Sequence, residues 1–118
     1  MFSVIFPGQG SQTVGMASEF YSKYDLFKKL YKEADEILNF NLPKLILEGP
    51  EEELRLTKNT QQAIMTVGVS IFNVLNNQFG LNLNNSKFFA GHSLGEYTAL
   101  VCSGSLSIKK AFVKFFLQ

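Results

Sequence analysis

The chain is 118 residues long, 46% of its residues are hydrophobic, and 18% are charged. That length supports one domain with a modest core, and the composition is that of an ordinary globular protein. Eleven basic residues against ten acidic ones give a net charge of +1. The lysines are scattered along the chain, so the charge pattern excludes a basic stripe for a nucleic-acid partner.

The cysteine count and the lengths of the apolar runs indicate the cellular compartment of the protein. Cys102 is the only cysteine, which excludes an internal disulfide and favours a reducing environment. No apolar run approaches the roughly 18 residues that a membrane span requires. Residues 2–6 form too short an apolar run for a signal peptide, and no basic segment precedes them. The sequence therefore predicts a cytoplasmic protein without a membrane partner.

The first half of the chain begins with a predicted strand. Residues 2–6 are apolar, rich in β-forming residues and followed by Pro-Gly, which is typical of a buried strand. Residues 25–38 carry apolar side chains at helical spacing and predict an amphipathic helix. A short helix is expected next, with Asn41 as its cap, Pro43 in its first turn and Gly49 at its end.

The middle of the chain predicts two further helices. Glutamates crowd residues 51–53, where the dipole of a short helix would favour acidic side chains, and they are expected to be solvated. Asn59 and Gln62 resemble a capping box and predict the start of the longest helix, which Gly80 would close.

The last third predicts a strand followed by two helices. Residues 87–90 form the second predicted strand, residues 94–102 the helix that follows it, and a final amphipathic helix starts near Ser107. Because helices separate the strands, the strands should pair in parallel, which gives an α/β fold. Reactive groups in such folds collect at the carboxyl ends of the strands, so the segments that follow the two predicted strands are expected to converge.

A short motif follows the second predicted strand. Residues 91–95 read Gly-His-Ser-Leu-Gly, which is the G-x-S-x-G pattern of a nucleophile elbow. In that pattern a strand turns sharply into a helix and holds the central serine, here Ser93, exposed on a strained backbone. Side chains at Gly91 or Gly95 would collide with the neighbouring strand or helix. The motif predicts Ser93 as a nucleophile and the backbone N–H of Leu94 as an oxyanion donor.

A second glycine-rich turn, residues 8–12, follows the first predicted strand. Its glycines would let the backbone of Gln9 approach a substrate closely, so the Gln9 N–H is the candidate for a second oxyanion donor. A phosphate loop of the dinucleotide-binding type is the alternative. It is disfavoured because Thr13 occupies the place of the third glycine, and no acidic residue ends a strand about 20 residues later.

His92 is the only histidine of the chain and precedes the predicted nucleophile. A serine nucleophile needs a base, but adjacent side chains diverge in a sharp turn. His92 is therefore interpreted as a structural or hydrogen-bonding residue rather than the base. Cys102 and the phenylalanines are interpreted as core residues.

Five segments occur in the order and approximate spacing of one known family. They are residues 6–12, 15–16, 49–54, 60–63 and 91–97. On these segments the chain closely resembles the malonyl-CoA:acyl carrier protein transacylases, the acyltransferases of type II fatty acid synthesis. The resemblance extends from residue 1 to about residue 111 and covers only the N-terminal part of that family's length.

The resemblance implies a ping-pong acyl transfer. Ser93 matches the family's nucleophile, which takes malonyl from coenzyme A and passes it to the phosphopantetheine thiol of acyl carrier protein. The family's oxyanion hole maps onto the N–H groups of Gln9 and Leu94. Gln61 matches a pocket-lining glutamine, with Gln62 in place of the family's proline. The resemblance implies acyl carrier protein and a coenzyme A thioester as partners, and neither a metal nor a tightly bound cofactor.

The resemblance also implies missing parts. The family's catalytic histidine lies downstream of this sequence, and its malonyl-binding arginine falls at Gln118 when counted without gaps; Arg55 lies in another region. Residues 1–118 are thus expected to form a truncated, hydrolase-like large subdomain of the acyltransferase fold, one incomplete domain with bare apolar faces. The alternatives to an active transferase are a non-catalytic remnant and, less favoured, an unrelated serine esterase.

Overall fold

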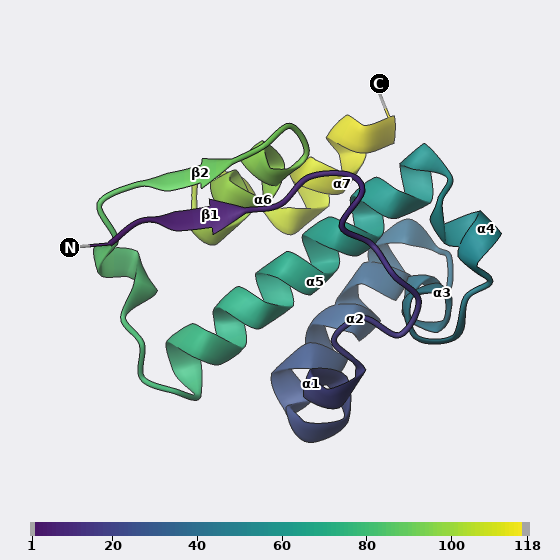
Figure 1. The fold of residues 1–118 in the computed structure, drawn as a ribbon, viewed down its shortest axis with the longest axis horizontal. Coiled ribbons are helices and arrows are strands. Elements are labelled where there is room, and N and C mark those ends of the chain that lie inside the picture. Colours follow the sequence, from purple (N-terminus) through teal and green to yellow (C-terminus); the bar gives the residue numbers. More distant parts are fainter. Residues whose placement is uncertain (1, 117–118) are drawn as a thin grey trace.

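The computed structural model describes residues 2–116 of the chain. Nine of its elements are helices or strands of regular geometry and one is a 3-10 turn (Figure 1). In chain order they are β1 (Val4–Phe6), α1 (Ser18–Lys23), α2 (Asp25–Leu38), α3 (Leu42–Glu48), α4 (Glu51–Leu54), α5 (Thr57–Asn77), η1 (Leu83–Asn85), β2 (Phe89–Gly91), α6 (Gly95–Cys102) and α7 (Ile108–Phe116).

The two strands form a parallel pair. Val4 lies opposite Phe89, and Phe6 lies opposite Gly91. The predicted α/β arrangement with a parallel sheet is therefore confirmed. Both strands are only three residues long, so residues 2–3 and residues 87–88 of the predicted strands fall outside them. Backbone hydrogen bonds nevertheless join these residues, because the Lys87 N–H donates to the Phe2 carbonyl oxygen over 2.8 Å and the Val4 N–H to the Phe88 carbonyl oxygen over 2.9 Å.

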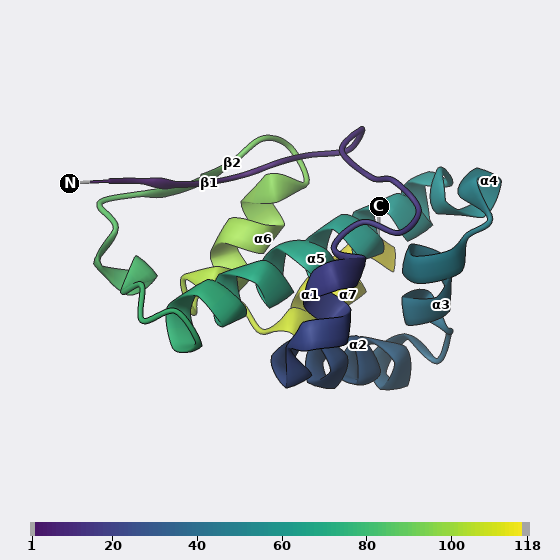
Figure 2. The same cartoon turned by 60° about the horizontal axis from the view of Figure 1, so that its bottom comes forward.

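The long helix α5 runs through the middle of the molecule. Figure 2 shows the sheet on one side of α5 and α2 on the other, with α6 between β2 and α5. The packing of α5 against α6 depends on Gly68, where an added Cβ would lie 2.9 Å from the Cγ2 atom of Thr98. Among residues 2–116, no helix combines the length and the apolar character needed to cross a bilayer.

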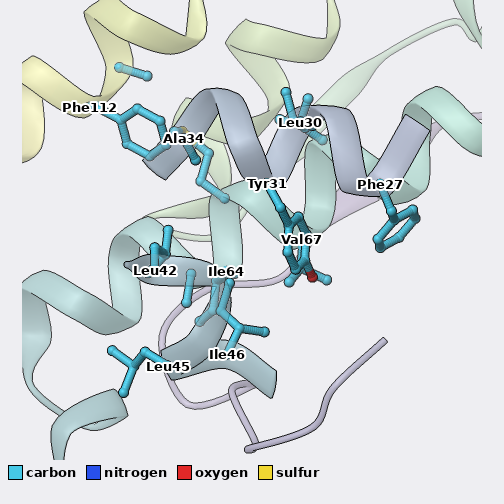
Figure 3. Close-up of a cluster of buried hydrophobic side chains, with 14 of the residues drawn as sticks. Phe27, Leu30, Tyr31, Ala34, Leu42, Leu45, Ile46, Ile64, Val67 and Phe112 are labelled. Atoms are coloured by element: carbon cyan, nitrogen blue, oxygen red, sulfur yellow. The ribbon is translucent and has the colours of Figure 1, made fainter. Parts of the chain in front are cut away.

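The main core lies between α2, α3 and α5 (Figure 3). Phe27, Tyr31 and Ala34 of α2 are at most 1% exposed and face the neighbouring helices. Leu42 and Ile46 of α3 are fully buried beside them. Burial of such apolar side chains is the dominant favourable term in folding, and here most of it lies on the side of α5 that faces away from the sheet.

The predicted helix ends have different outcomes. The Asn41 cap is confirmed, because its side-chain oxygen accepts a hydrogen bond from the Lys44 N–H over 3.1 Å. The capping box at Asn59 is wrong, because α5 begins at Thr57. The Asn59 amide instead donates to the Glu53 carbonyl oxygen over 2.9 Å. The same Glu53 carbonyl oxygen accepts from the Leu56 N–H over 3.2 Å, so the Asn59 side chain joins the end of α4 to the start of α5.

The assignment of all phenylalanines to the core is also wrong. Phe88 is 61% exposed and Phe79 is 54% exposed, whereas Phe27 and Phe112 are fully buried. Phe88 precedes β2, on the side of the sheet that no helix of the described residues covers. Helix α1 was not predicted; it has no buried residue and therefore lacks the apolar periodicity that reveals a helix.

Two phenylalanine substitutions should separate core from surface. We expect Phe27→Ala to lower the free energy of unfolding by about 3–5 kcal/mol, because it leaves a cavity between α2 and its neighbours. The control Phe88→Ala removes the same atoms from an exposed position and should change stability by less than about 1 kcal/mol. Urea denaturation followed by circular dichroism measures both values; equal losses would contradict this placement of the core.

Candidate active site

Parallel pairing brings the two glycine-rich turns together at one end of the sheet. Both turns leave from paired residues, because Phe6 and Gly91 are the last partners in the ladder. The His92 N–H donates to the Phe6 carbonyl oxygen over 3.2 Å, which extends the contact into the turns. A Cβ added at Gly8 would lie 2.5 Å from the His92 carbonyl oxygen, so only glycine fits there. The predicted convergence of the two turns is therefore confirmed.

The turn after β2 has the geometry of an elbow. Ser93 has a φ of 55°, in the left-handed region that serine adopts only at a cost, and its side chain is exposed. A Cβ added at Gly95 would overlap the Phe6 carbonyl oxygen, and one at Gly91 would overlap the Gly95 backbone. Both glycines are thus required by close backbone contacts, as the sequence predicted. The nucleophilic role of Ser93 stays a prediction.

Two backbone donors lie at the edge of this turn. Leu94 is the N-cap residue of α6, at the helix end where backbone N–H groups have no partner within the helix. Gln9 follows Phe6 by three residues, as Leu94 follows Gly91. The Gln9 side chain contacts the start of α5, where its Nε2 donates to Thr57 Oγ1 over 3.4 Å. Their roles as oxyanion donors remain predictions.

The first turn of α5 contacts the Gln9 turn through Thr57. Thr57, which holds the Gln9 side chain, was not singled out in the sequence because a lone threonine at a helix start carries no distinctive signal. Gln61 lies one helical turn after Thr57 and on the same face, and it is half-buried. The next residue, Gln62, is 1% exposed, and within the described residues its amide atoms have no hydrogen-bond partner.

Several predicted components are not brought together. Gln118, the position of the family's arginine, lies outside the described residues. Arg55 is exposed at the end of α4. His92 adjoins Ser93 and is exposed, with its ring beside Gly8. Across residues 2–116, no three histidine, cysteine, aspartate or glutamate side chains gather closely enough to hold a metal ion.

Cys102 is the other nucleophilic side chain near the sheet. It ends α6 and packs against both hydrophobic clusters. Burial raises the pKa of its thiol to about 12, so the thiol stays neutral at physiological pH. Since the thiolate is the reactive form, this thiol is unreactive at physiological pH. Cys102 is partly buried at the edge of the core, which it was interpreted to fill.

Comparison with known proteins places this geometry in a family. A family model described as the acyl transferase domain matches residues 3–117. Malonyl CoA-acyl carrier protein transacylase of Bacillus subtilis (strain 168) is 47% identical over 107 residues, which cover 91% of this chain and 32% of the relative. The chain therefore belongs to the acyl transferase domain family.

Solved structures agree with this assignment. A crystal structure of an acyl carrier protein S-malonyltransferase from Vibrio cholerae has a TM-score of 0.88 and 43% identity, and the match covers 95% of this chain and 36% of that one. A malonyl-transacylase solved in complex with a type II PKS acyl-carrier protein has a TM-score of 0.90 and 39% identity, over 98% and 37% of the two chains. The chain thus spans about a third of the length of the relatives that it matches.

The left-handed backbone at Ser93 has a measurable consequence. An L-residue in this region costs about 1–2 kcal/mol, which glycine does not incur. We expect Ser93→Gly to be more stable toward urea than Ser93→Ala, by about 1 kcal/mol. At Ser105, whose φ is not positive, we expect the opposite: Ser105→Ala should be more stable toward urea than Ser105→Gly. Equal stability of the two Ser93 variants would mean that the turn relaxes out of the left-handed region.

The raised pKa of Cys102 predicts a pH dependence. The unfolded thiol ionises near pH 8.5, while the folded thiol resists ionisation to about pH 12. Its contribution to stability is therefore complete below pH 8 and is lost as pH rises from about 9 to about 12. The difference in urea midpoint between the native sequence and Cys102→Ala should shrink or reverse over that range. A difference that is constant with pH would contradict the burial of this thiol.

Proposed function

We propose that this chain supplies the nucleophile and oxyanion donors of a malonyl transferase that acts in fatty acid biosynthesis. The observation that carries the proposal is the exposed Ser93 at φ 55°, held by glycine contacts at the start of α6. The names of its relatives, malonyl transferases at up to 47% identity, supply the substrate class. Residues 1–118 correspond, in this proposal, to the N-terminal part of a hydrolase-like acyltransferase domain.

The first half-reaction is the attack of the Ser93 hydroxyl oxygen on the thioester carbonyl of malonyl-CoA. A C–O bond forms, and negative charge develops on the former carbonyl oxygen. The backbone N–H groups of Gln9 and Leu94 are the candidates to receive that charge, and one such donor is worth roughly 2.7–4 kcal/mol. When the C–S bond breaks, coenzyme A leaves as a thiol, with the proton that Ser93 loses, and malonyl remains as a serine ester.

The second half-reaction reverses the first with a different thiol. The phosphopantetheine thiol of acyl carrier protein attacks the malonyl ester, its proton returns to the Ser93 oxygen, and malonyl leaves as a new thioester. Gln61, one turn into α5, is proposed to line the acyl pocket. The proposed chemistry uses neither a metal nor a tightly bound cofactor. Its acyl donor is a coenzyme A thioester and its acceptor is the thiol of acyl carrier protein, so we expect it in the cytoplasm.

The proposal includes a low rate for the isolated chain. A general base contributes about 10²–10⁴-fold to such reactions, and the only histidine, His92, adjoins Ser93 in a sharp turn. Acylation by the 118-residue chain alone should therefore be slow.

A non-catalytic remnant of the transferase is the second candidate. The observation that favours it is that His92, the only histidine, adjoins Ser93 and is poorly placed to act as its base. A serine esterase is disfavoured, because it leaves the close packing of Gly8 against His92 unexplained.

The acyl-enzyme is directly testable. After incubation with malonyl-CoA, intact-protein mass spectrometry should detect one slowly formed malonyl adduct, and peptide mapping should locate it on Ser93. Ser93→Ala should lose the adduct, while the matched control Ser105→Ala, at another exposed serine of the same region, should keep it. Absence of any adduct on a chain whose circular dichroism shows folding would favour the remnant. An adduct on Cys102 would contradict both assignments.

A further inference from the structure

Burial does not hold the turn that contains Gln9. Gly8 is buried against His92, but residues 9–11 are all exposed. Gly10 has a φ of 108°, in a region that glycine enters freely, so no side chain restricts its backbone. Exposed segments with few buried contacts are the least stable parts of a fold. A fixed position for the Gln9 backbone therefore requires bonds to other parts of the chain.

Two side-chain hydrogen bonds fix this turn. Gln9 Nε2 donates to Thr57 Oγ1 over 3.4 Å, which joins residues that lie 48 positions apart in the sequence. The Gly10 N–H donates to Gln12 Oε1 over 2.8 Å, which closes the turn on itself. The first bond ties the turn to α5, and the second stiffens it. The backbone of Gln9 is thus held through its own side chain and through the residue that follows it.

Thr57 belongs to a firmly held part of the molecule. It is the first residue of α5. In the next turn of that helix, the buried Thr60 donates its hydroxyl to the Leu54 carbonyl oxygen, which joins the start of α5 to α4. Thr57 itself is exposed, so its side chain adds little to the core. A role for its hydroxyl is therefore to be sought in the bond to Gln9.

Thr57 also connects two parts of the proposed site. Gln61, which is proposed to line the acyl pocket, lies one helical turn later on the same face of α5. The bond from Gln9 to Thr57 therefore sets the Gln9 turn against the helix face that carries Gln61. An oxyanion donor acts over only about 2.7–3.1 Å, and a misplacement of about 1 Å can cost a rate factor of about 100. Small shifts of this turn would thus affect the transfer.

We propose that Thr57 is a positioning residue for the acyl transfer. Its hydroxyl oxygen accepts the hydrogen bond of the Gln9 side chain and so holds the Gln9 backbone N–H where the oxyanion develops. Thr57 acts through Gln9 and takes no part in the bonds that form or break. The inference rests on the proposed function, because an oxyanion donor is needed only if acyl transfer occurs here. Since the oxyanion forms only after the substrate is bound, loss of this contact should lower kcat and leave KM unchanged.

The first test compares rates of malonyl adduct formation on Ser93, measured by intact-protein mass spectrometry over a range of malonyl-CoA concentrations. Thr57→Val keeps the shape of the side chain and removes its hydroxyl. Its rate at saturation should fall about three- to tenfold, which is the range for loss of one hydrogen bond, at an unchanged half-saturating concentration. Thr57→Ser keeps the hydroxyl and should restore the rate. The matched control Thr13→Val, at an exposed threonine of the same loop, should react as the native chain does.

A double-mutant cycle tests whether Thr57 acts through Gln9. Gln9→Met removes the Nε2 donor and keeps the backbone N–H. Because Gln9→Met and Thr57→Val break the same bond, the double variant should be no slower than either single variant. Rate losses that multiply would overturn the proposal, because Thr57 would then act in another way. A loss that Thr57→Ser fails to restore, together with a lower urea midpoint, would also overturn it and leave Thr57 a purely structural role.

A measurement without substrate separates this inference from the proposed function. The NMR order parameter of the Gln9 backbone N–H should be near the rigid value of about 0.85 in the native chain and in Thr57→Ser, and should fall toward about 0.6 in Thr57→Val. If the native chain forms no adduct, malonyl transfer fails as its function, while the order parameter still decides whether Thr57 holds the turn. An order parameter that is equal in all three chains would overturn the positioning role, whatever the rates.

Discussion

Parallel pairing of β1 with β2 is the constraint on which the rest of the site depends. The register that sets Phe6 against Gly91 fixes where both turns leave the sheet. It also brings the Phe6 carbonyl oxygen so close to the first turn of α6 that only glycine fits at position 95. The elbow around Ser93 and the turn that contains Gln9 are therefore two consequences of one contact between strands.

The two-stranded sheet lies outside the main hydrophobic core. Most apolar burial lies on the other side of α5, where α2 and α3 pack. Only a small cluster, formed by Phe6, Phe72 and Ala99, joins the sheet to α5 and α6. The helical core can thus hold α5 and α6 in place while the sheet keeps an open edge. The larger hydrophobic cluster and the site geometry therefore lie in different layers of the molecule.

The predicted elements differ in how strongly local residues specify them. The α2 helix was predicted with its observed limits, because its apolar residues lie on one face. The start of α5 was predicted two residues late, because Asn59 bonds to a carbonyl oxygen of the preceding helix rather than to its own helix. Thr57 and the buried Gln62 acquire their importance from contacts across the fold, which no local pattern contains.

By itself, the sequence determined the α/β class, the elbow at Ser93 and its glycines, because each depends on local backbone geometry and on residue types at fixed spacing. It also predicted the two-turn site and the family resemblance. Only the tertiary structure decided which phenylalanines are buried, what holds the Gln9 side chain, and that the outer edge of β1 borders an apolar cleft. These features depend on contacts between residues far apart in the chain. The sequence pattern around one residue reports its local conformational propensity and contains no information about such contacts.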